Sequence, residues 1–179
     1  MPRSPQSSES DTVGSSAESA AAPLQEAIGS VLGRIPSGLF VVTWRAAEAD
    51  RFMLASWVMQ AGFSPPAITV AVGSSRDLLT AIATGTPFVV NILGESQRPL
   101  LARFGRPPVA GEDPFAGIEI VRGSSGAPAI AAATGWLECR GIAQAPSGDH
   151  TIVVAEVTDG RTGSAEPPLV HLRRNGLRY

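Results

Sequence analysis

The residues best suited to chemistry lie between Phe52 and Asn91, where apolar runs of strand length alternate with small, hydroxyl-bearing turns. In one of these turns Ser74 and Ser75 are followed directly by Arg76, the only basic residue of this stretch. Hydroxyls and a guanidinium bind a phosphate group, small residues let backbone amides approach a ligand, and apolar walls accept a planar ring. The composition by itself predicts an anion-binding site in a β-rich domain.

The same residues also have structural interpretations, which the composition leaves open. Residues 53–57 would form an ordinary strand with Trp57 in the core, and an arginine in a polar turn is usually only solvated. Asn91 stands inside an apolar run, where an unsatisfied amide would cost about 1–3 kcal/mol. Backbone groups would then have to satisfy this amide.

The composition limits the other kinds of chemistry that the chain could perform. It contains two histidines, one cysteine and 14 basic residues, all of which are arginine. Without lysine, a Walker A phosphate loop and a lysine Schiff base are excluded. Neither a metal-ligand spacing nor a GxGxxG fingerprint occurs, so we expect no metal site and no Rossmann domain. Cys139 is interpreted as a small apolar residue of a buried strand. A histidine in an exposed turn, such as His150, usually has no role, and His171 is expected to be structural.

The spacing of apolar residues predicts the elements that must position these groups. A helix is expected from Pro23 to Gly33. The other expected helices are residues 75–84 and 96–104, and the expected strands are residues 37–44, 52–60, 67–72, 88–93, 118–121, 136–144, 150–157 and 169–172. The first two strands are expected to pair as a hairpin, as are strands 136–144 and 150–157, whereas residues 123–134 are small and read as a flexible loop. This is a mainly β fold with peripheral helices (α+β), and a closed barrel would leave no bare edges.

The length and the net charge of the chain limit its domain organisation and the partners that it can have. The 179 residues are most simply one domain at 23–179 behind a tail at 1–22, which is rich in Ser, Ala, Glu and Pro and is expected to be disordered. A net charge of −2 without a basic run argues against a nucleic-acid partner, and no apolar stretch suggests a membrane helix. A lone cysteine cannot form an internal disulfide, which fits a reducing, cytoplasmic location.

The order of several short motifs is more specific than any one of them. These motifs are Ile35-Pro36-Ser37-Gly38, Phe40-Val41-Val42-Thr43, Leu54-Ala55-Ser56-Trp57, Pro65-Pro66, Phe88-Val89-Val90-Asn91-Ile92-Leu93, Gly111-Glu112-Asp113, Leu137-Glu138-Cys139 and Gly148-Asp149-His150. Together they resemble the flavin reductase-like family of FMN-binding split barrels, in particular the flavin reductase module at the C-terminal end of diflavin flavoproteins. The resemblance covers residues 24–179. It implies a split β-barrel, a homodimer, and FMN as cofactor, with FAD as the other choice.

The resemblance also implies roles for particular residues. On the flavin side it implies cofactor contacts from Met53, Leu54, Ala55, Ser56, Trp57, Gln60, Ser74, Ser75, Arg76, Val90 and Asn91. On the nicotinamide side it implies Asp149, His150 and Tyr179, with His150 as the catalytic residue that orients NAD(P)H rather than an obligatory acid. The sequence departs from the family at Gln60 and Gly62, where many relatives carry hydroxyls. For Val90 and Asn91 the structural interpretation stays equally open.

The function implied by the resemblance is that of an oxidoreductase, an NAD(P)H-dependent flavin reductase. NAD(P)H would be the substrate, and electrons would pass from the flavin to oxygen, free flavin or a protein partner. Because the module stands alone in this sequence, we expect such a redox partner in trans. Two alternatives stay open: an FMN-holding electron-transfer or flavin-carrier protein that NAD(P)H does not reduce, and a cofactor-free split-barrel dimerisation module. NADH and NADPH are not distinguished, because no basic cluster for a 2′-phosphate can be placed.

Overall fold

The computed structural model describes residues 13–109 and 111–177, with side chains from residue 22 onward. Its residues fall into two compact units. Residues 37–171 form one unit, and the segments before residue 37 and after residue 171 form the other.

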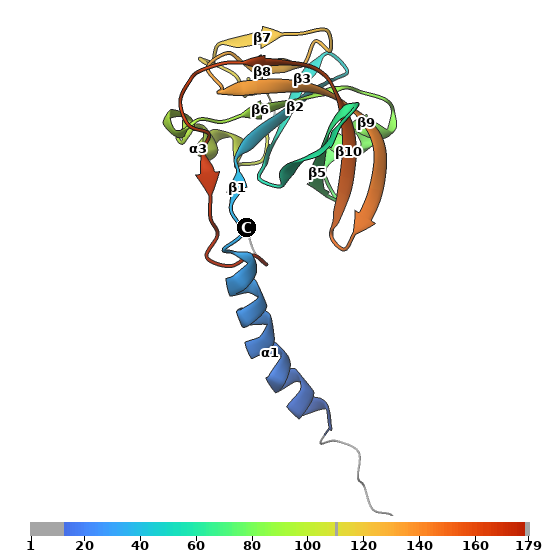
Figure 1. The fold of residues 1–179 in the computed structure, drawn as a ribbon, viewed down its shortest axis with the longest axis vertical. Coiled ribbons are helices and arrows are strands. Elements are labelled where there is room, and N and C mark those ends of the chain that lie inside the picture. Colours follow the sequence, from blue (N-terminus) through green and yellow to red (C-terminus); the bar gives the residue numbers. More distant parts are fainter. Residues whose placement is uncertain (1–12, 110, 178–179) are drawn as a thin grey trace, which may run out of the picture. The chain divides into compact units, whose positions relative to one another are not determined.

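An antiparallel sheet of seven strands is the frame of residues 37–171 (Figure 1). Its strands in chain order are β2 (Phe40–Ala46), β3 (Ala49–Ala55), β4 (Val58–Phe63), β5 (Pro66–Gly73), β6 (Phe88–Ile92), β9 (Gly135–Ser147) and β10 (His150–Thr162). Across the sheet the order is β3-β2-β6-β9-β10-β5-β4. Two short pairs join β1 (Ser37–Gly38) to β11 (Val170–His171) and β7 (Ile120–Arg122) to β8 (Pro128–Ile130). The mainly β fold predicted from the sequence is therefore confirmed.

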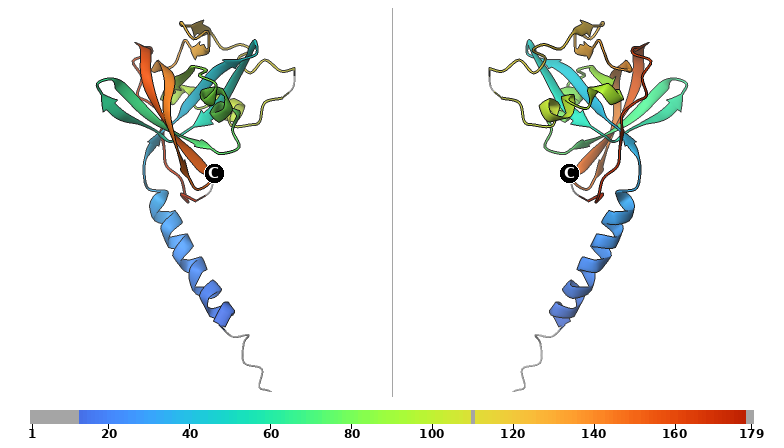
Figure 2. Two further views of the ribbon diagram at one scale, coloured as in Figure 1. Left: turned by 90° about the vertical axis from the view of Figure 1, so that its right-hand side faces the viewer. Right: turned by 90° about the vertical axis from the view of Figure 1, so that its left-hand side faces the viewer.

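The sheet curls into a barrel that is split rather than closed (Figure 2). β3 and β4 stand at the two ends of the sheet order, and no pairing joins them within the described part of residues 37–171. The chain passes from β3 to β4 through Ser56 and Trp57 alone, and β4 then pairs with β5 instead of with β3. The closed barrel suggested by the strand pattern is therefore wrong, because among the described residues both end strands keep an outer edge without a strand partner. The split β-barrel implied by the motifs is confirmed.

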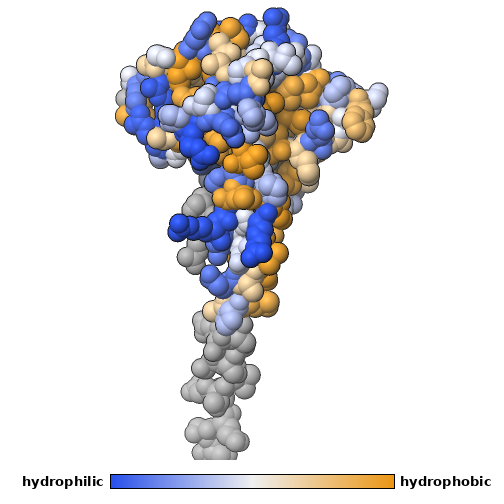
Figure 3. All heavy atoms as spheres, turned by 60° about the vertical axis from the view of Figure 1, so that its left-hand side comes forward, coloured by the Kyte–Doolittle hydropathy of each residue, from blue (hydrophilic) through white to orange (hydrophobic). Residues whose placement is uncertain are grey.

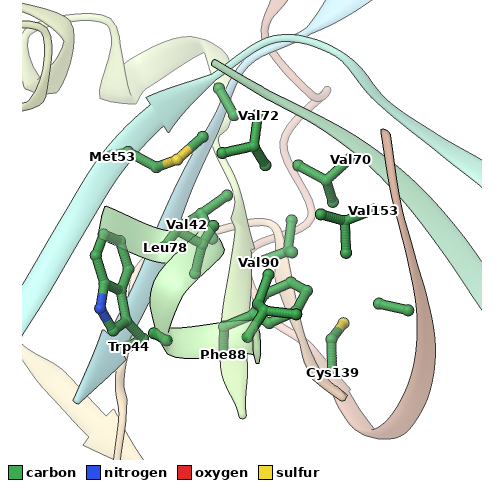
Figure 4. Packing of buried hydrophobic residues seen from close by; sticks show 14 of the residues in the cluster. Val42, Trp44, Met53, Val70, Val72, Leu78, Phe88, Val90, Cys139 and Val153 are labelled. Atoms are coloured by element: carbon green, nitrogen blue, oxygen red, sulfur yellow. The ribbon is translucent and has the colours of Figure 1, made fainter. Parts of the chain in front are cut away.

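Successive residues of β2 and β3 face two different apolar clusters. Val42, Trp44 and Met53 belong to the first cluster, where they meet side chains of β5, β6, β9 and β10 (Figure 4). Val41 and Phe52 belong to the second cluster, which includes residues after β6. Strands that are buried on both faces read as continuous apolar runs, which is why the period-2 pattern of surface strands is missing here.

Short helices accompany the sheet, and they differ in detail from the prediction. They are α2 (Asp77–Ala83), the 3₁₀ helix η1 (Glu95–Gln97) and α3 (Leu100–Phe104). α2 covers the first cluster with Leu78, Ala81 and Ile82. The single helix expected at residues 96–104 is divided at Pro99, which has no N–H to donate to a continuing helix.

Three strand predictions also require correction. The strand expected at residues 52–60 is interrupted after Ala55 and resumes at Val58. Residues 128–130 form β8, although the surrounding small residues had suggested only a loop. β9 and β10 are longer than expected, with 13 residues each. The C-terminal ends of both strands are exposed, so no alternation of apolar and polar residues marks them in the sequence. Two register shifts also interrupt the pairing of β9 with β10.

The other unit contains α1 (Val13–Leu32), which begins well before the predicted start at Pro23. Alanine-rich residues favour a helix upstream of this proline. The backbone N–H groups of Arg173 and Gly176 donate to Gly33 and Gly29, at 3.1 and 2.7 Å. In Figure 3 one side of the described helix is apolar and the other polar. The predicted disorder of residues 1–12 lies outside the described residues.

Within residues 13–109 and 111–177, no helix combines the length and the apolar character needed to cross a membrane.

Candidate functional site

Two of the predicted site segments, far apart in the sequence, lie next to each other. β5 ends at Gly73 and β10 begins at His150, and these two residues are register partners in the antiparallel pair. Just beyond them, the backbone N–H of Ser74 donates to the carbonyl of Asp149 at 2.9 Å. The sheet therefore brings the Ser74–Arg76 turn and the Gly148–His150 turn together at one end of the β5–β10 pair.

His150 is held between a carboxylate and an indole. Its Nδ1 lies 2.8 Å from Oδ1 of Asp149, and its ring centroid lies 4.9 Å from that of Trp57. The imidazole is 8% exposed, whereas the Asp149 side chain stands in solvent. These two contacts hold the imidazole ring in a defined orientation. The interpretation of His150 as an exposed turn residue without a role is therefore corrected, because the residue is buried.

Trp57 lies beside His150 rather than in the core. The indole is 40% exposed, so the structural interpretation that buried Trp57 in the core is wrong. The backbone N–H of Ala71 in β5 donates to the carbonyl of Trp57 at 3.0 Å, which ties the β3–β4 connection to the strand that leads to Ser74. Three sequence segments thus meet at His150.

The electrostatics of the turn favour an ionised Asp149. The hydrogen bond from His150, together with the nearby imidazole charge, lowers the pKa of Asp149 below its ordinary value. An ionised carboxylate accepts from Nδ1–H of His150, and this contact orients the imidazole ring. Asp149 acts here as a positioning residue for the imidazole.

The Ser74–Arg76 turn offers exposed donors beside the start of α2. Both serines and Arg76 are exposed, and the backbone N–H of Arg76 donates to the carbonyl of Gly73 at 2.9 Å. Arg76 is the residue that precedes α2, and its side chain does not cap that helix. Asp77 places a negative charge in the first turn of α2, which would repel a phosphate. The guanidinium of Arg76 is therefore the group that can neutralise a phosphate here.

The segment of β3 predicted to lie along a cofactor has most of its side chains inside the protein. Met53 and Ala55 are buried in the first cluster, and Leu54 packs against the second. Ser56 is nearly buried at 9% exposure. β3 is an end strand, however, and no other strand of the described residues pairs with its outer edge. A ligand would therefore meet its backbone groups rather than its side chains.

Asn91 and Val90 have the structural role that the sequence left open. Both side chains are fully buried. The Asn91 amide donates from Nδ2 to the carbonyl of Val41 at 2.9 Å, and its Oδ1 accepts from the backbone N–H of Ile130 at 2.7 Å. The amide thus joins β6 to β2 and β8, and a cofactor contact from these two residues stays a prediction.

The remaining predicted residues are distributed as follows. Gln60 is exposed on β4, where it is the register partner of Ile68. Tyr179 lies outside the described residues. Cys139 is buried in the first cluster, as predicted, and burial raises its pKa to about 12, so its thiol is unreactive. No group of three or more His, Cys, Asp or Glu residues suitable for a metal ion occurs in the described ranges.

Sequence reasoning did not foresee the contact between Trp57 and His150. The two residues are far apart in the chain, and only the register of β5 with β10 and β4 brings them together. Nor did it foresee that Ser74 and Asp149 share a backbone hydrogen bond. The signal available in the sequence was the presence of turn residues at the ends of two long apolar runs. Which of these turns become neighbours depends on the order of the strands in the sheet.

Comparison with known proteins connects this geometry to a family. Residues 32–177 match the model of the flavin reductase like domain. "Diflavin flavoprotein A 1" of Synechocystis sp. is 39% identical over 150 residues, which are 83% of this chain and 26% of the relative. "Putative diflavin flavoprotein A 6" of Nostoc sp. is 37% identical over 150 residues, with the same coverage. The chain thus spans about a quarter of the length of these curated relatives.

Solved structures give the same fold. The NADH:FAD oxidoreductase SgcE6 of Streptomyces globisporus is 27% identical, with a TM-score of 0.73 over 94% of this chain and 95% of that chain. The structure of SgcE6 in complex with NAD and FAD fragments matches with a TM-score of 0.71 at 29% identity, over 80% of this chain and 85% of that chain. The family predicted from the motifs is confirmed.

Proposed function

Because the chain belongs to the flavin reductase like domain family, we propose that it is an NAD(P)H:flavin oxidoreductase that holds FMN, or FAD, between β3 and the Ser74–Arg76 turn. The observation that carries the proposal is the junction of two turns at His150. A phosphate-binding donor set and an oriented imidazole are adjacent there, as a site for two different ligands requires.

The residues present fit a flavin. Ser74, Ser75 and Arg76 supply two hydroxyls and a guanidinium for its phosphate, all of them exposed. The outer edge of β3, which pairs with no other strand of the described residues, supplies backbone donors and acceptors for the polar edge of a ring. Trp57 supplies an exposed aromatic surface. A flavin bound there would supply the capacity to accept a hydride and release electrons one or two at a time.

His150 would orient the nicotinamide nucleotide. Its ring is held by the contact of Nδ1 with Asp149 and by the neighbouring Trp57 indole, so the imidazole presents a fixed surface to a nucleotide. A solved structure of SgcE6 is in complex with NAD and FAD fragments, which supports binding of both kinds of nucleotide by this fold. The residue positions the substrate, and the redox chemistry belongs to the cofactor.

We further propose a homodimer that covers the outer strand β4. Phe63 is 95% exposed and Met59 is 70% exposed on this strand, next to the half-exposed Trp57. Large apolar side chains exposed on an end strand support an interaction face there. The proposed function includes a cytoplasmic location. It also includes an electron acceptor, which would be oxygen, free flavin or a partner protein.

Flavin binding followed by anaerobic reduction tests the proposed function. The purified chain is titrated with FMN and with FAD, and NADH or NADPH is then added without oxygen. We expect saturable flavin binding and bleaching of the flavin band by one of the two nucleotides. A bound flavin that neither nucleotide bleaches would indicate an electron carrier. Failure to bind either flavin would refute both readings and leave a dimerisation module.

A further inference from the structure

One side of α1 carries a row of large aliphatic side chains that are open to solvent. Leu24, Ile28, Val31 and Ile35 follow one another at spacings of four, three and four residues, and Ile35 lies just beyond the helix end. Their exposed fractions range from 42% to 67%. Figure 3 shows apolar residues gathered along one side of the described helix. This spacing is that of the a and d positions of a coiled coil. We call these four side chains the α1 stripe.

The opposite side of α1 is occupied by the end of the chain. Gly29 and Gly33 are buried, and a Cβ on these glycines would collide with Asn175 and with the backbone of Arg173 respectively. The backbone hydrogen bonds from Gly176 and Arg173 to the two glycines hold that segment against the helix. With 3.6 residues per turn, the glycines lie roughly 150° around the helix from the α1 stripe. The C-terminal segment therefore packs on α1 and leaves the stripe exposed.

The width and the composition of α1 limit what can cover the stripe. Leu32 is the one other large apolar side chain of α1 that is exposed among the described residues. A row of a and d positions is the narrow contact of one helix with another, whereas a broader apolar face covers a core. No basic residue occurs in α1, although helices that lie on a lipid surface are rich in Lys or Arg on their polar face. The stripe therefore fits a protein helix rather than a membrane surface.

The charges along α1 favour a second copy of the same helix as that partner. The acidic residues Glu18 and Glu26 lie within α1. Arg34 follows the end of the helix, and the backbone hydrogen bond from Arg173 to Gly33 brings Arg173 and its neighbour in sequence to the same end. Two parallel copies would gather these guanidinium groups at one end, where they repel each other. Two antiparallel copies would place them toward the acidic part of the partner helix and would also oppose the two helix dipoles.

We propose that α1 pairs with α1 of a second copy of this chain, in an antiparallel arrangement that buries the α1 stripe of both copies. Such a contact is two-fold symmetric and closes on itself. Because α1 is only about 30 Å long, the contact is small and the association should be weak, with a dissociation constant of about ten to a hundred micromolar. The inference goes beyond the proposed function and does not rest on it, because α1 and β4 belong to different units and the pairing needs no flavin.

Sedimentation equilibrium of the full chain tests the proposal. Met59→Ser and Phe63→Ser are introduced first, so that association through the exposed side chains of β4 does not contribute. We expect a monomer–dimer equilibrium that Ile28→Glu weakens about tenfold or more. Ile28→Ala raises helix propensity and should also weaken the dimer, which would exclude loss of the helix as the cause. A chain that stays monomeric up to about 300 µM would overturn the proposal and leave the stripe to a helix of another protein.

A matched control and a distance measurement complete the test. Ser30→Glu makes the same change in net charge at an exposed position away from the stripe, and it should associate within about threefold of its parent. Equal weakening by Ser30→Glu and Ile28→Glu would overturn the proposal. A spin label attached through Ile35→Cys reports the orientation, because the thiol of Cys139 is buried and unreactive. Labels about 20–30 Å apart support the antiparallel pair, and labels closer than about 15 Å overturn it.

Discussion

Replacing Asn91 by alanine should destabilise the fold and leave flavin affinity nearly unchanged. The substitution removes the donor to the Val41 carbonyl and the acceptor of the Ile130 N–H, both of which are buried. Each buried group left unsatisfied costs about 1–3 kcal/mol, so the free energy of unfolding should fall by about 2–5 kcal/mol. For a chain of this length that corresponds to a melting temperature lower by about 5–15 °C.

Chemical denaturation and flavin titration of the same preparations measure the two effects. Gln60→Ala is the matched control, because it removes an amide that is exposed on β4 and should change stability by less than about 0.5 kcal/mol. Native stability in Asn91→Ala would refute the assignment of Asn91 as a link between β6, β2 and β8. Native stability together with a large loss of flavin affinity would instead establish it as a cofactor residue.

Three further substitutions or titrations test other parts of the account. Arg76→Ala should weaken FMN binding by about ten- to hundredfold, because it removes the charged donors of the turn, and an unchanged titration would exclude that role. The pKa of Asp149 is lowered by His150, so the stabilisation of this turn should be present above the ordinary carboxyl pKa and be lost as the pH falls through the lower folded value. Carboxyl NMR titration measures it, and a pKa at or above the ordinary value would contradict the contact. Burial raises the pKa of Cys139 to about 12, so its thiol should not react with a thiol reagent at neutral pH in the folded chain, and it should react after denaturation. Rapid labelling of the native chain would show that the thiol is accessible. Since the folded pKa is raised, this cysteine should also lower stability as the pH rises above the ordinary thiol value.

The sequence predicted the strands that are rich in apolar residues and the family to which they belong. β5 and β6 were found within one residue, because each is a continuous apolar run between turn residues. The strand expected at residues 37–44 is divided at Leu39 into β1 and β2. β8 was missed because Pro128 and Ala129 carry little strand preference. The Asn91 amide, the Thr43 hydroxyl that donates to the carbonyl of Pro128, and the pairing with β7 hold this strand in place. The start of α1 was missed because Pro23 was interpreted as a first-turn residue, whereas it lies inside the helix.

The candidate site was predicted in its parts but not in its assembly. Hydroxyls beside an arginine and an Asp-His turn are visible in the sequence, and the family order of motifs assigned them to two ligands. The contact between the Trp57 and His150 rings depends on the register of β5 with two neighbouring strands, which composition does not specify.

Anaerobic stopped-flow reduction of the flavin-loaded chain, compared between native protein and His150→Ala, tests the central claim most directly. We predict that His150→Ala binds FMN with native affinity but requires about three- to tenfold more nucleotide for half-maximal reduction, since one orienting hydrogen bond is lost. Loss of flavin affinity in this variant, with an unchanged nucleotide requirement, would contradict the account. It would mean that the two turns that meet at His150 do not form adjacent flavin and nicotinamide sites.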